Sequence, residues 1–165
     1  MTPTPPVIPA QFPESFADRL RLVRALVEYE AHRATATGTP SRWEQKTYRA
    51  FLADPIPRTD LPGRCDTALC VAGWAIELSP EWRWLHEAPT HDGWDDDLVV
   101  PATCPDPDGN EVDAWEAGTD ILGLTGDQAN ALFDAENSLQ TVLAMIDLLL
   151  ENPRAEYHAL RAVRS

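Results

Sequence analysis

The amino-acid sequence predicts a mainly α-helical fold, a compact single-domain bundle of six or seven helices with at most one small β-hairpin near residues 98–113. Two apolar stretches, Cys65–Leu78 and Leu139–Leu150, are expected to form the centre of the bundle. Capping and turn residues separate the other helical patterns. We therefore expect a hydrophobic core formed mainly between helices.

The stretch Cys65–Leu78, which reads CDTALCVAGWAIEL, has hardly a polar position after its start. A helix that is apolar around its whole circumference is a buried helix, so this stretch predicts the central helix. Asp66 or Thr67 is the expected N-cap, because either side chain can accept a hydrogen bond from the first turn. Gly73 costs about 1 kcal/mol relative to Ala inside a helix, and we therefore expect close backbone packing there.

The N-terminal residues 1–13 contain five prolines and no hydrophobic periodicity. They are expected to be extended or disordered, and residues 14–165 are expected to form the single domain. Ser15 followed by Asp18 resembles a capping box, and helical apolar spacing then continues until Gly38. The charged residues expected mostly on the opposite face of this first helix are Arg19, Arg21, Arg24, Glu28 and Glu30.

Residues 41–64 predict a second, shorter helix and then a loop. Ser41 is a suitable N-cap for a helix that continues to Leu52. A proline-rich loop over residues 54–64 separates this helix from the central one. Further along, the turn sequence 105–110, PDPDGN, favours the small hairpin.

The C-terminal third predicts four helices with defined ends. Ser, Thr, Asp and Asn side chains cap helix N-termini, and glycine suits the position after a helix C-terminus. The expected N-caps are Asp113, Thr125, either Asn137 or Ser138, and Asn152, while Gly123 is expected to end the first of these helices. In the last helix, Tyr157, Leu160 and Val163 recur three residues apart and are expected to pack together.

The charge of the chain is strongly asymmetric. The formal net charge is −14, and residues 84–153 contain sixteen carboxylates but no Lys or Arg. Such a region repels phosphate backbones and anionic membranes and attracts cations and basic proteins. The helix–turn–helix pattern over Thr119–Glu136 also offers no cation to a DNA groove. We expect a basic protein surface as partner, without direct binding to nucleic acid or to a membrane.

The expected compartment is the cytoplasm. No apolar run approaches the roughly 20 residues of a membrane-spanning helix. The N-terminus lacks the basic start and apolar region of a secretory signal. The three cysteines are an odd number, which argues against a disulfide framework.

Two segments, RWEQKTY from Arg42 and CDTALCVAGWA from Cys65, resemble small proteins from actinobacteria and their phages. Those proteins carry a Trp-x-Gln segment and a Cys-Gly-Thr-x-x-Cys-x-Ala-Gly-Trp-Ala box. Trp43 and Gln45 match the first, whereas Asp66 stands where the box has Gly; Asp tolerates a left-handed backbone better than most residues. The resemblance implies the fold and an actinobacterial or phage source, and it supplies no activity.

Cys65, Cys70, His86 and His91 are the candidate metal ligands. Zinc takes thiolate and imidazole ligands in tetrahedral sites, and four residues separate the two cysteines and also the two histidines. In the alternative that we favour, Cys70 is a small buried apolar side chain. Cys65 near a helix N-terminus suits a reactive thiolate, and pairing with His86 or His91 gives the enzyme alternative.

The candidate partner-binding residues flank or belong to one acidic loop. Aromatic side chains are favoured anchors at interfaces, and carboxylates attract a basic surface. These residues are Trp82, Trp84, Trp94, Asp95, Asp96 and Asp97.

The sequence contains no recognisable catalytic set beside its polarised charge. The favoured hypothesis is therefore a non-enzymatic acidic protein-interaction or regulatory module, encoded by a phage or mobile element in one version. A sharper alternative is a DNA mimic that inhibits a host nucleic-acid-binding protein. The third alternative is a zinc-binding or Cys-dependent enzyme. The identity of the partner and the oligomeric state stay open.

Overall fold

The computed structural model describes residues 4–39, 41–43, 45, 49–51, 67–82, 103–105 and 108–163. Over these residues the fold is mainly helical, which confirms the predicted fold class. None of the described helices is both long and apolar enough to cross a bilayer. The helices are α1 (Phe16–Thr37), α2 (Val71–Leu78), α3 (Ala114–Leu122), α4 (Gly126–Leu132), α5 (Leu139–Glu151) and α6 (Tyr157–Ala162). The strands are β1 (Arg49–Phe51), β2 (Thr67–Leu69), β3 (Thr103–Pro105) and β4 (Glu111–Asp113).

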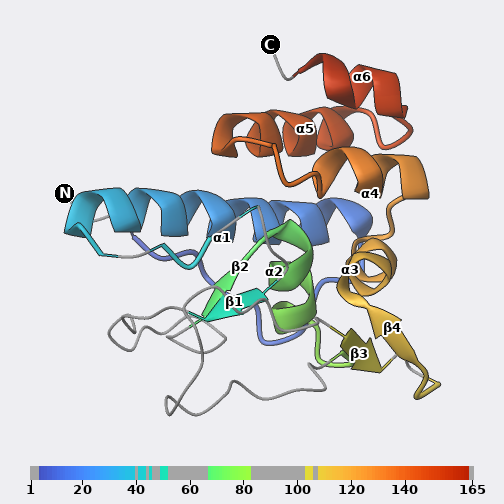
Figure 1. Ribbon diagram of the computed structural model, residues 1–165, viewed down its shortest axis with the longest axis horizontal. Coiled ribbons are helices and arrows are strands. Elements are labelled where there is room, and N and C mark those ends of the chain that lie inside the picture. The colour runs from blue at the N-terminus through green and yellow to red at the C-terminus, as the bar shows by residue number, and fades with distance from the viewer. Residues whose placement is uncertain are drawn as a thin grey trace.

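The long helix α1 runs through the middle of the molecule (Figure 1). On one side, α5 lies alongside α1, and α6 lies beyond α5 near the C-terminus. On the other side, α2 packs against both α1 and α3. Because α4 contacts α3, α5 and α6, it joins the two sides at one end of α1. The core therefore forms on both sides of α1, with α2 on one side and α5 on the other. The sequence instead predicts the two apolar stretches, and not the first helix, at the centre of the bundle.

Helix α1 has the ends that the sequence predicts. The Ser15 side chain accepts a hydrogen bond from the Asp18 N–H at 3.1 Å. Gly38 ends the helix with a φ of 66°, a left-handed conformation that glycine adopts without steric cost. The buried apolar face consists of Leu20, Leu22, Val23, Leu26 and Val27.

Helix α2, which the sequence predicts as the central helix, begins later than expected. Cys70 is its N-cap, and Thr67 lies in strand β2 instead of capping the helix. Asp66 lies outside the described residues. The backbone of Thr67–Leu69 is hydrogen-bonded to a segment distant in sequence, and a local apolar pattern carries no information about such pairing.

The helix expected from Ser41 to Leu52 does not form in the described part of that segment. Arg49–Phe51 is strand β1 and pairs antiparallel with β2. Trp43 forms an isolated parallel bridge to Leu69, whose N–H donates to the Arg42 carbonyl at 2.8 Å. Short helices are marginal without tertiary support, and here the backbone hydrogen bonds go to β2 instead.

Helices α2 and α3 approach each other closely at Ala72 and Gly118. A Cβ atom added to Gly118 would lie 2.6 Å from the Ala72 Cβ and 3.3 Å from a Phe133 ring carbon. Both residues are buried. A glycine is therefore needed on α3 at this crossing, because any side chain would push the two helices apart.

The C-terminal helices confirm three of the four predicted N-caps. Thr125 and Gln128 complete a reciprocal capping box at α4. Gly123 ends α3 with a φ of 68°, as predicted. The side chains of Asp113, Thr125 and Ser138 accept hydrogen bonds from the N–H groups of Glu116, Gln128 and Thr141 respectively.

The fourth predicted N-cap, Asn152, is wrong. Asn152 is the C-cap of α5, and Glu156 is the N-cap of α6. The Asn152 Oδ1 atom instead accepts a hydrogen bond from the Arg154 N–H at 3.2 Å, which stabilises a local turn. Leu160 is buried, and Tyr157 and Val163 pack against the same core, as their spacing predicts.

Strands β3 and β4 pair antiparallel, with Cys104 opposite Val112. This pair lies within residues 98–113, where the sequence favours a hairpin. Asp113 is both the last residue of β4 and the N-cap of α3. The strand therefore fixes the point at which α3 begins.

The described N-terminal segment, residues 4–14, has no helix or strand, yet it packs against the domain. Ile8 and Phe12 lie against the hydrophobic core. Arg19 of α1 donates from Nε to the Pro13 carbonyl at 2.7 Å, and its guanidinium lies 5.4 Å from the centre of the Phe12 ring. Residues 8–14 of this segment form one wall of a surface groove.

Candidate functional site

Of the four candidate zinc ligands, Cys70 alone lies in the described part of the chain. Cys65, His86 and His91 lie outside it. Within the described ranges, no three His, Cys, Asp or Glu side chains are grouped so that they can hold a metal ion. The zinc site and the Cys-dependent enzyme therefore stay predictions.

The thiol of Cys70 is enclosed at the N-terminus of α2. Its exposed fraction is 1 %, and the side chain makes no capping hydrogen bond. Burial raises the pKa of the thiol from an ordinary value of 9.0 to about 11, although backbone N–H groups of the helix partly offset this effect. A thiol with so high a pKa is a poor nucleophile at neutral pH. This environment favours the structural role for Cys70.

Trp82 is the one candidate partner-binding residue in the described part of the chain. Its exposed fraction is 8 %, and it packs in the hydrophobic core. Trp84, Trp94 and the three aspartates 95–97 lie outside the described residues. Their role as interface anchors stays a prediction, while Trp82 contributes to the wall of a groove.

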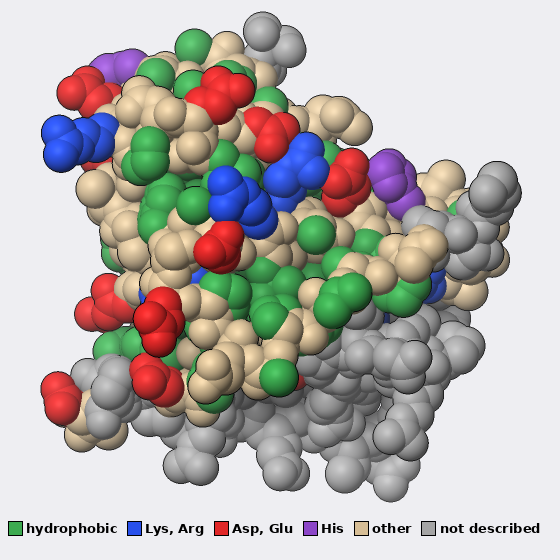
Figure 2. All heavy atoms as spheres, turned by 180° about the vertical axis from the view of Figure 1, so that it is seen from behind, with side chains coloured by type: hydrophobic (Ala, Val, Ile, Leu, Met, Phe, Trp, Pro, Cys, Tyr) green, Lys and Arg blue, Asp and Glu red, His purple; other side chains and the backbone are tan. Residues whose placement is uncertain are grey.

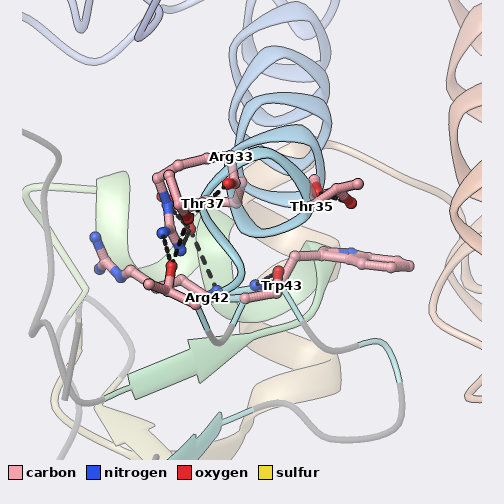
Figure 3. A network of polar contacts seen from close by, with 9 residues as sticks. Arg33, Thr35, Thr37, Arg42 and Trp43 are labelled. Atoms are coloured by element: carbon pink, nitrogen blue, oxygen red, sulfur yellow. Dashed lines mark hydrogen bonds and ion pairs between the residues drawn. The ribbon is translucent and has the colours of Figure 1, made fainter. Parts of the chain in front are cut away.

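A buried polar network lies at the C-terminal end of α1 (Figure 3). Glu30, which the sequence places mostly on the polar face, is fully buried. Its Oε2 atom accepts hydrogen bonds from Arg33 Nη2 at 2.9 Å, from Arg33 Nε at 3.1 Å and from the Arg42 N–H at 3.2 Å. Arg33 also donates from Nη1 to the Thr39 hydroxyl at 2.7 Å. This network attaches the chain after α1 to the helix itself.

The Trp43 side chain points away from this network (Figure 3) and packs, partly buried, against the hydrophobic core. Gln45 is buried. Gln45 Nε2 donates to the Leu132 carbonyl at 2.9 Å. The Arg42 guanidinium lies 5.0 Å from the centre of the Trp74 ring, in cation–π geometry. Three of the residues that carry the sequence resemblance, Trp43, Gln45 and Trp74, therefore join segments of the fold.

Four exposed carboxylates form an acidic stripe along β4 and α3. We define the stripe as Glu111, Asp113, Glu116 and Asp120. Glu111 and Asp113 point to the same side of β4, since they are two residues apart. Asp113, the N-cap of α3, is three positions before Glu116, and Asp120 is four positions after it, so the three residues share one face of the helix. In Figure 2, carboxylates gather at this edge of the molecule, on the left of the view.

The described arginines do not neutralise the acidic stripe. Arg24 pairs with Asp147 and Glu28, and Arg161 pairs with Asp134. Arg21 pairs with Asp18, and Arg33 pairs with Glu30. No described cation lies in ion-pair contact with the stripe, and its negative charge therefore faces solvent.

A groove of about 880 Å³ adjoins the acidic stripe. We call it the N-terminal groove, because residues 8–14 form one wall; α1, the end of α2 and the end of α3 form the others. Its apolar lining consists of Ile8, Phe12, Leu22, Leu78, Trp82 and Ile121. Its carboxylates are Glu14, Glu81 and Asp120, and none of them pairs with a described cation. Asp120 belongs to both the groove and the stripe.

Sequence reasoning locates the acidic region but misses the groove. The signal for charge is local, since residues 84–153 lack cations. The groove forms from segments that are distant in sequence, and no local pattern predicts their meeting.

No protein-family model, curated protein or solved structure matches the chain. Its function must therefore be inferred from the chemistry of its own described surface.

Proposed function

We propose that this protein is a non-enzymatic interaction or regulatory module that binds a basic face of a partner protein. The observation that supports this proposal is the acidic stripe, whose four exposed carboxylates lie on adjoining elements without a paired cation among the described residues. Helix α3 holds Glu116 and Asp120 in fixed spacing, and Asp113 is its N-cap. A cationic surface of matching spacing can neutralise them together.

Charge complementarity of this kind affects the rate of association more than the affinity of the complex. The Debye length is about 8 Å at physiological ionic strength, so the stripe acts mainly on a nearby partner. Complementary charge raises the association rate and weakens with salt. Exposed ion pairs contribute only about 0–1 kcal/mol each. The complex therefore needs further contacts for tight binding.

The competing explanation is that the carboxylates only keep the protein soluble. The two explanations differ in one respect: a binding surface depends on where the charge lies, whereas solubility depends on the total. The chain offers matched variants that separate them. Glu111→Lys with Glu116→Lys reverses half of the stripe. Glu136→Lys with Glu151→Lys makes the same change of net charge at exposed positions outside it.

The experiment is affinity capture with the immobilised wild-type protein and the two double variants. Retained proteins are identified by mass spectrometry at about 50 mM and about 500 mM salt, after circular dichroism has shown that both variants are folded. Each retained protein is then purified and titrated. We expect basic proteins that bind the wild type and the Glu136/Glu151 variant equally and bind the Glu111/Glu116 variant about tenfold more weakly. Equal loss in both variants would contradict the proposal.

The identity of the captured proteins decides the sharper alternatives. A nucleic-acid-binding protein that DNA displaces competitively would support the DNA-mimic form. Basic proteins without a nucleic-acid site would support the general form. Elemental analysis of the purified protein addresses the zinc alternative, because stoichiometric zinc would reopen the enzyme hypothesis.

A further inference from the structure

We infer that the N-terminal groove binds a peptide segment of the basic partner that carries both apolar side chains and Lys or Arg. This inference rests on the proposed function, since Asp120 is shared by the groove and the acidic stripe. It adds a place for the contacts that the stripe alone does not supply. Three features of the groove support it, namely its apolar lining, the unused backbone groups of its N-terminal wall and its charge.

The apolar lining suits aliphatic or aromatic side chains. Leu78 at the end of α2 and Trp82, four residues further along, line the groove together with Ile8 and Phe12 of the N-terminal segment. All four are partly or largely buried, and they belong to the hydrophobic core or pack against it. Such side chains gain roughly 25 cal/mol for each Å² of apolar surface that a ligand covers. The groove therefore offers the hydrophobic contact that is absent from the exposed stripe.

The N-terminal wall of the groove offers unused backbone groups to a peptide. Residues 8–12 have neither helix nor strand, and their backbone groups form no hydrogen bond with described residues. A bound peptide can form individual hydrogen bonds with such unused N–H and C=O groups. Continuous strand pairing is not expected, because Ala10 and Gln11 form a bend and Pro9 has no N–H to donate.

The charge of the groove selects basic residues. Glu14, Glu81 and Asp120 are exposed, and none pairs with a described cation. The single Arg19 in the lining already donates to the carbonyls of Pro13 and Ile121. Carboxylates therefore outnumber cations, and a Lys or Arg beside an apolar anchor would be attracted.

The test uses fluorescein-labelled peptides and fluorescence anisotropy with the full chain. The probe is the amide Lys-Leu-Lys-Phe-Lys-Leu. Its controls are Glu-Leu-Glu-Phe-Glu-Leu, which reverses the charge, and Lys-Ser-Lys-Ser-Lys-Ser, which removes the apolar anchors. We expect both controls to bind about tenfold more weakly than the probe.

Two variant pairs locate the binding. Ile8→Ser should weaken binding several-fold, whereas Val7→Ser should not, because Val7 is 90 % exposed and does not line the groove. Glu81→Lys should weaken binding, whereas Glu151→Lys, the same charge change on α5, should not. In ¹H–¹⁵N spectra, the probe should shift the amide signals of Ile8, Leu78 and Ile121.

One set of results would contradict the groove inference, and a different set would contradict the proposed function. If the probe binds but is insensitive to Ile8→Ser and Glu81→Lys, and is weakened only by the Glu111/Glu116 variant, the groove inference is wrong and the acidic interaction surface survives. If Lys-Ser-Lys-Ser-Lys-Ser binds as well as the probe, or none of the peptides binds, the groove is also excluded. The affinity capture above, which uses no groove variant, decides the proposed function independently.

Discussion

Arg19 Nη1 donates a hydrogen bond to the Ile121 carbonyl oxygen at 2.6 Å, across 102 residues of sequence. The same guanidinium donates from Nε to the Pro13 carbonyl at 2.7 Å and stacks against Phe12. One side chain of α1 therefore holds the N-terminal segment and the end of α3 together. These are two of the walls of the N-terminal groove, so Arg19 fixes the shape of the groove rather than its charge.

Arg19→Ala should loosen the N-terminal segment. Two carbonyl oxygens lose a charged donor, and a lost hydrogen bond to a charged group costs about 1.5–3 kcal/mol. Urea denaturation measures the free energy of unfolding, and limited proteolysis should cut residues 4–14 faster. Arg21→Ala is the control, because Arg21 is exposed and pairs only with the exposed Asp18. Equal proteolysis of both variants would show that Arg19 does not hold the segment.

Glu30→Ala should be among the most destabilising substitutions in α1. It removes the carboxylate that accepts two hydrogen bonds from the buried Arg33 and one from the Arg42 backbone. Breaking one partner of a buried ion pair costs about 3–5 kcal/mol. Glu28→Ala removes a half-exposed partner of Arg24 and should cost less than about 1 kcal/mol. Thermal and urea unfolding of both variants check the difference, and similar losses would contradict the buried network.

Gly118→Ala should destabilise the contact between α2 and α3. The new methyl group would lie 2.6 Å from the Ala72 Cβ, and overpacking of this kind costs about 1–3 kcal/mol. Gly126→Ala is the matched control, because its Cβ would meet only a Trp115 ring carbon at an ordinary 3.8 Å. The control should be neutral or stabilising by up to about 1 kcal/mol. Urea denaturation measures the unfolding midpoint of each variant. A midpoint for Gly118→Ala that is not lower than the midpoint for Gly126→Ala would contradict the prediction.

Cys70 should resist alkylation in the folded protein. Because burial raises the pKa of its thiol to about 11, iodoacetamide at about pH 8 should modify Cys70 only after denaturation. Peptide mapping by mass spectrometry measures the modified fraction. Rapid modification of Cys70 under native conditions would show that the thiol is accessible and reactive.

The raised pKa of the Cys70 thiol also predicts how the free energy of unfolding changes with pH. The folded-state pKa lies above the unfolded value of 9.0, so the stability that the buried thiol contributes is fully present below pH 9.0. It is lost as the pH rises toward about 11, because the unfolded chain ionises first. Cys70→Ala should make the free energy of unfolding less dependent on pH over this range.

Local sequence alone determined the fold class and most helix ends. The side chains of Ser15, Thr125 and Ser138 accept hydrogen bonds from N–H groups three residues further along the chain. An N-cap of this kind can therefore be identified without knowledge of the fold. Gly38 and Gly123 end helices with positive φ, which is again a property of one residue. The acidic character of residues 84–153 is likewise a direct count of charges.

Tertiary structure decided the features that depend on a distant partner. The chain around Arg49–Phe51 is a strand because it pairs with Thr67–Leu69, and that pairing also delays the start of α2. Glu30 accepts a hydrogen bond from the Arg42 N–H, which lies twelve residues along the chain. Arg19 joins two walls of the groove, the N-terminal segment and the end of α3. Contacts between segments that are distant in sequence stabilise a conformation only after the chain between them has closed into a loop. A local stretch of residues therefore does not reveal them.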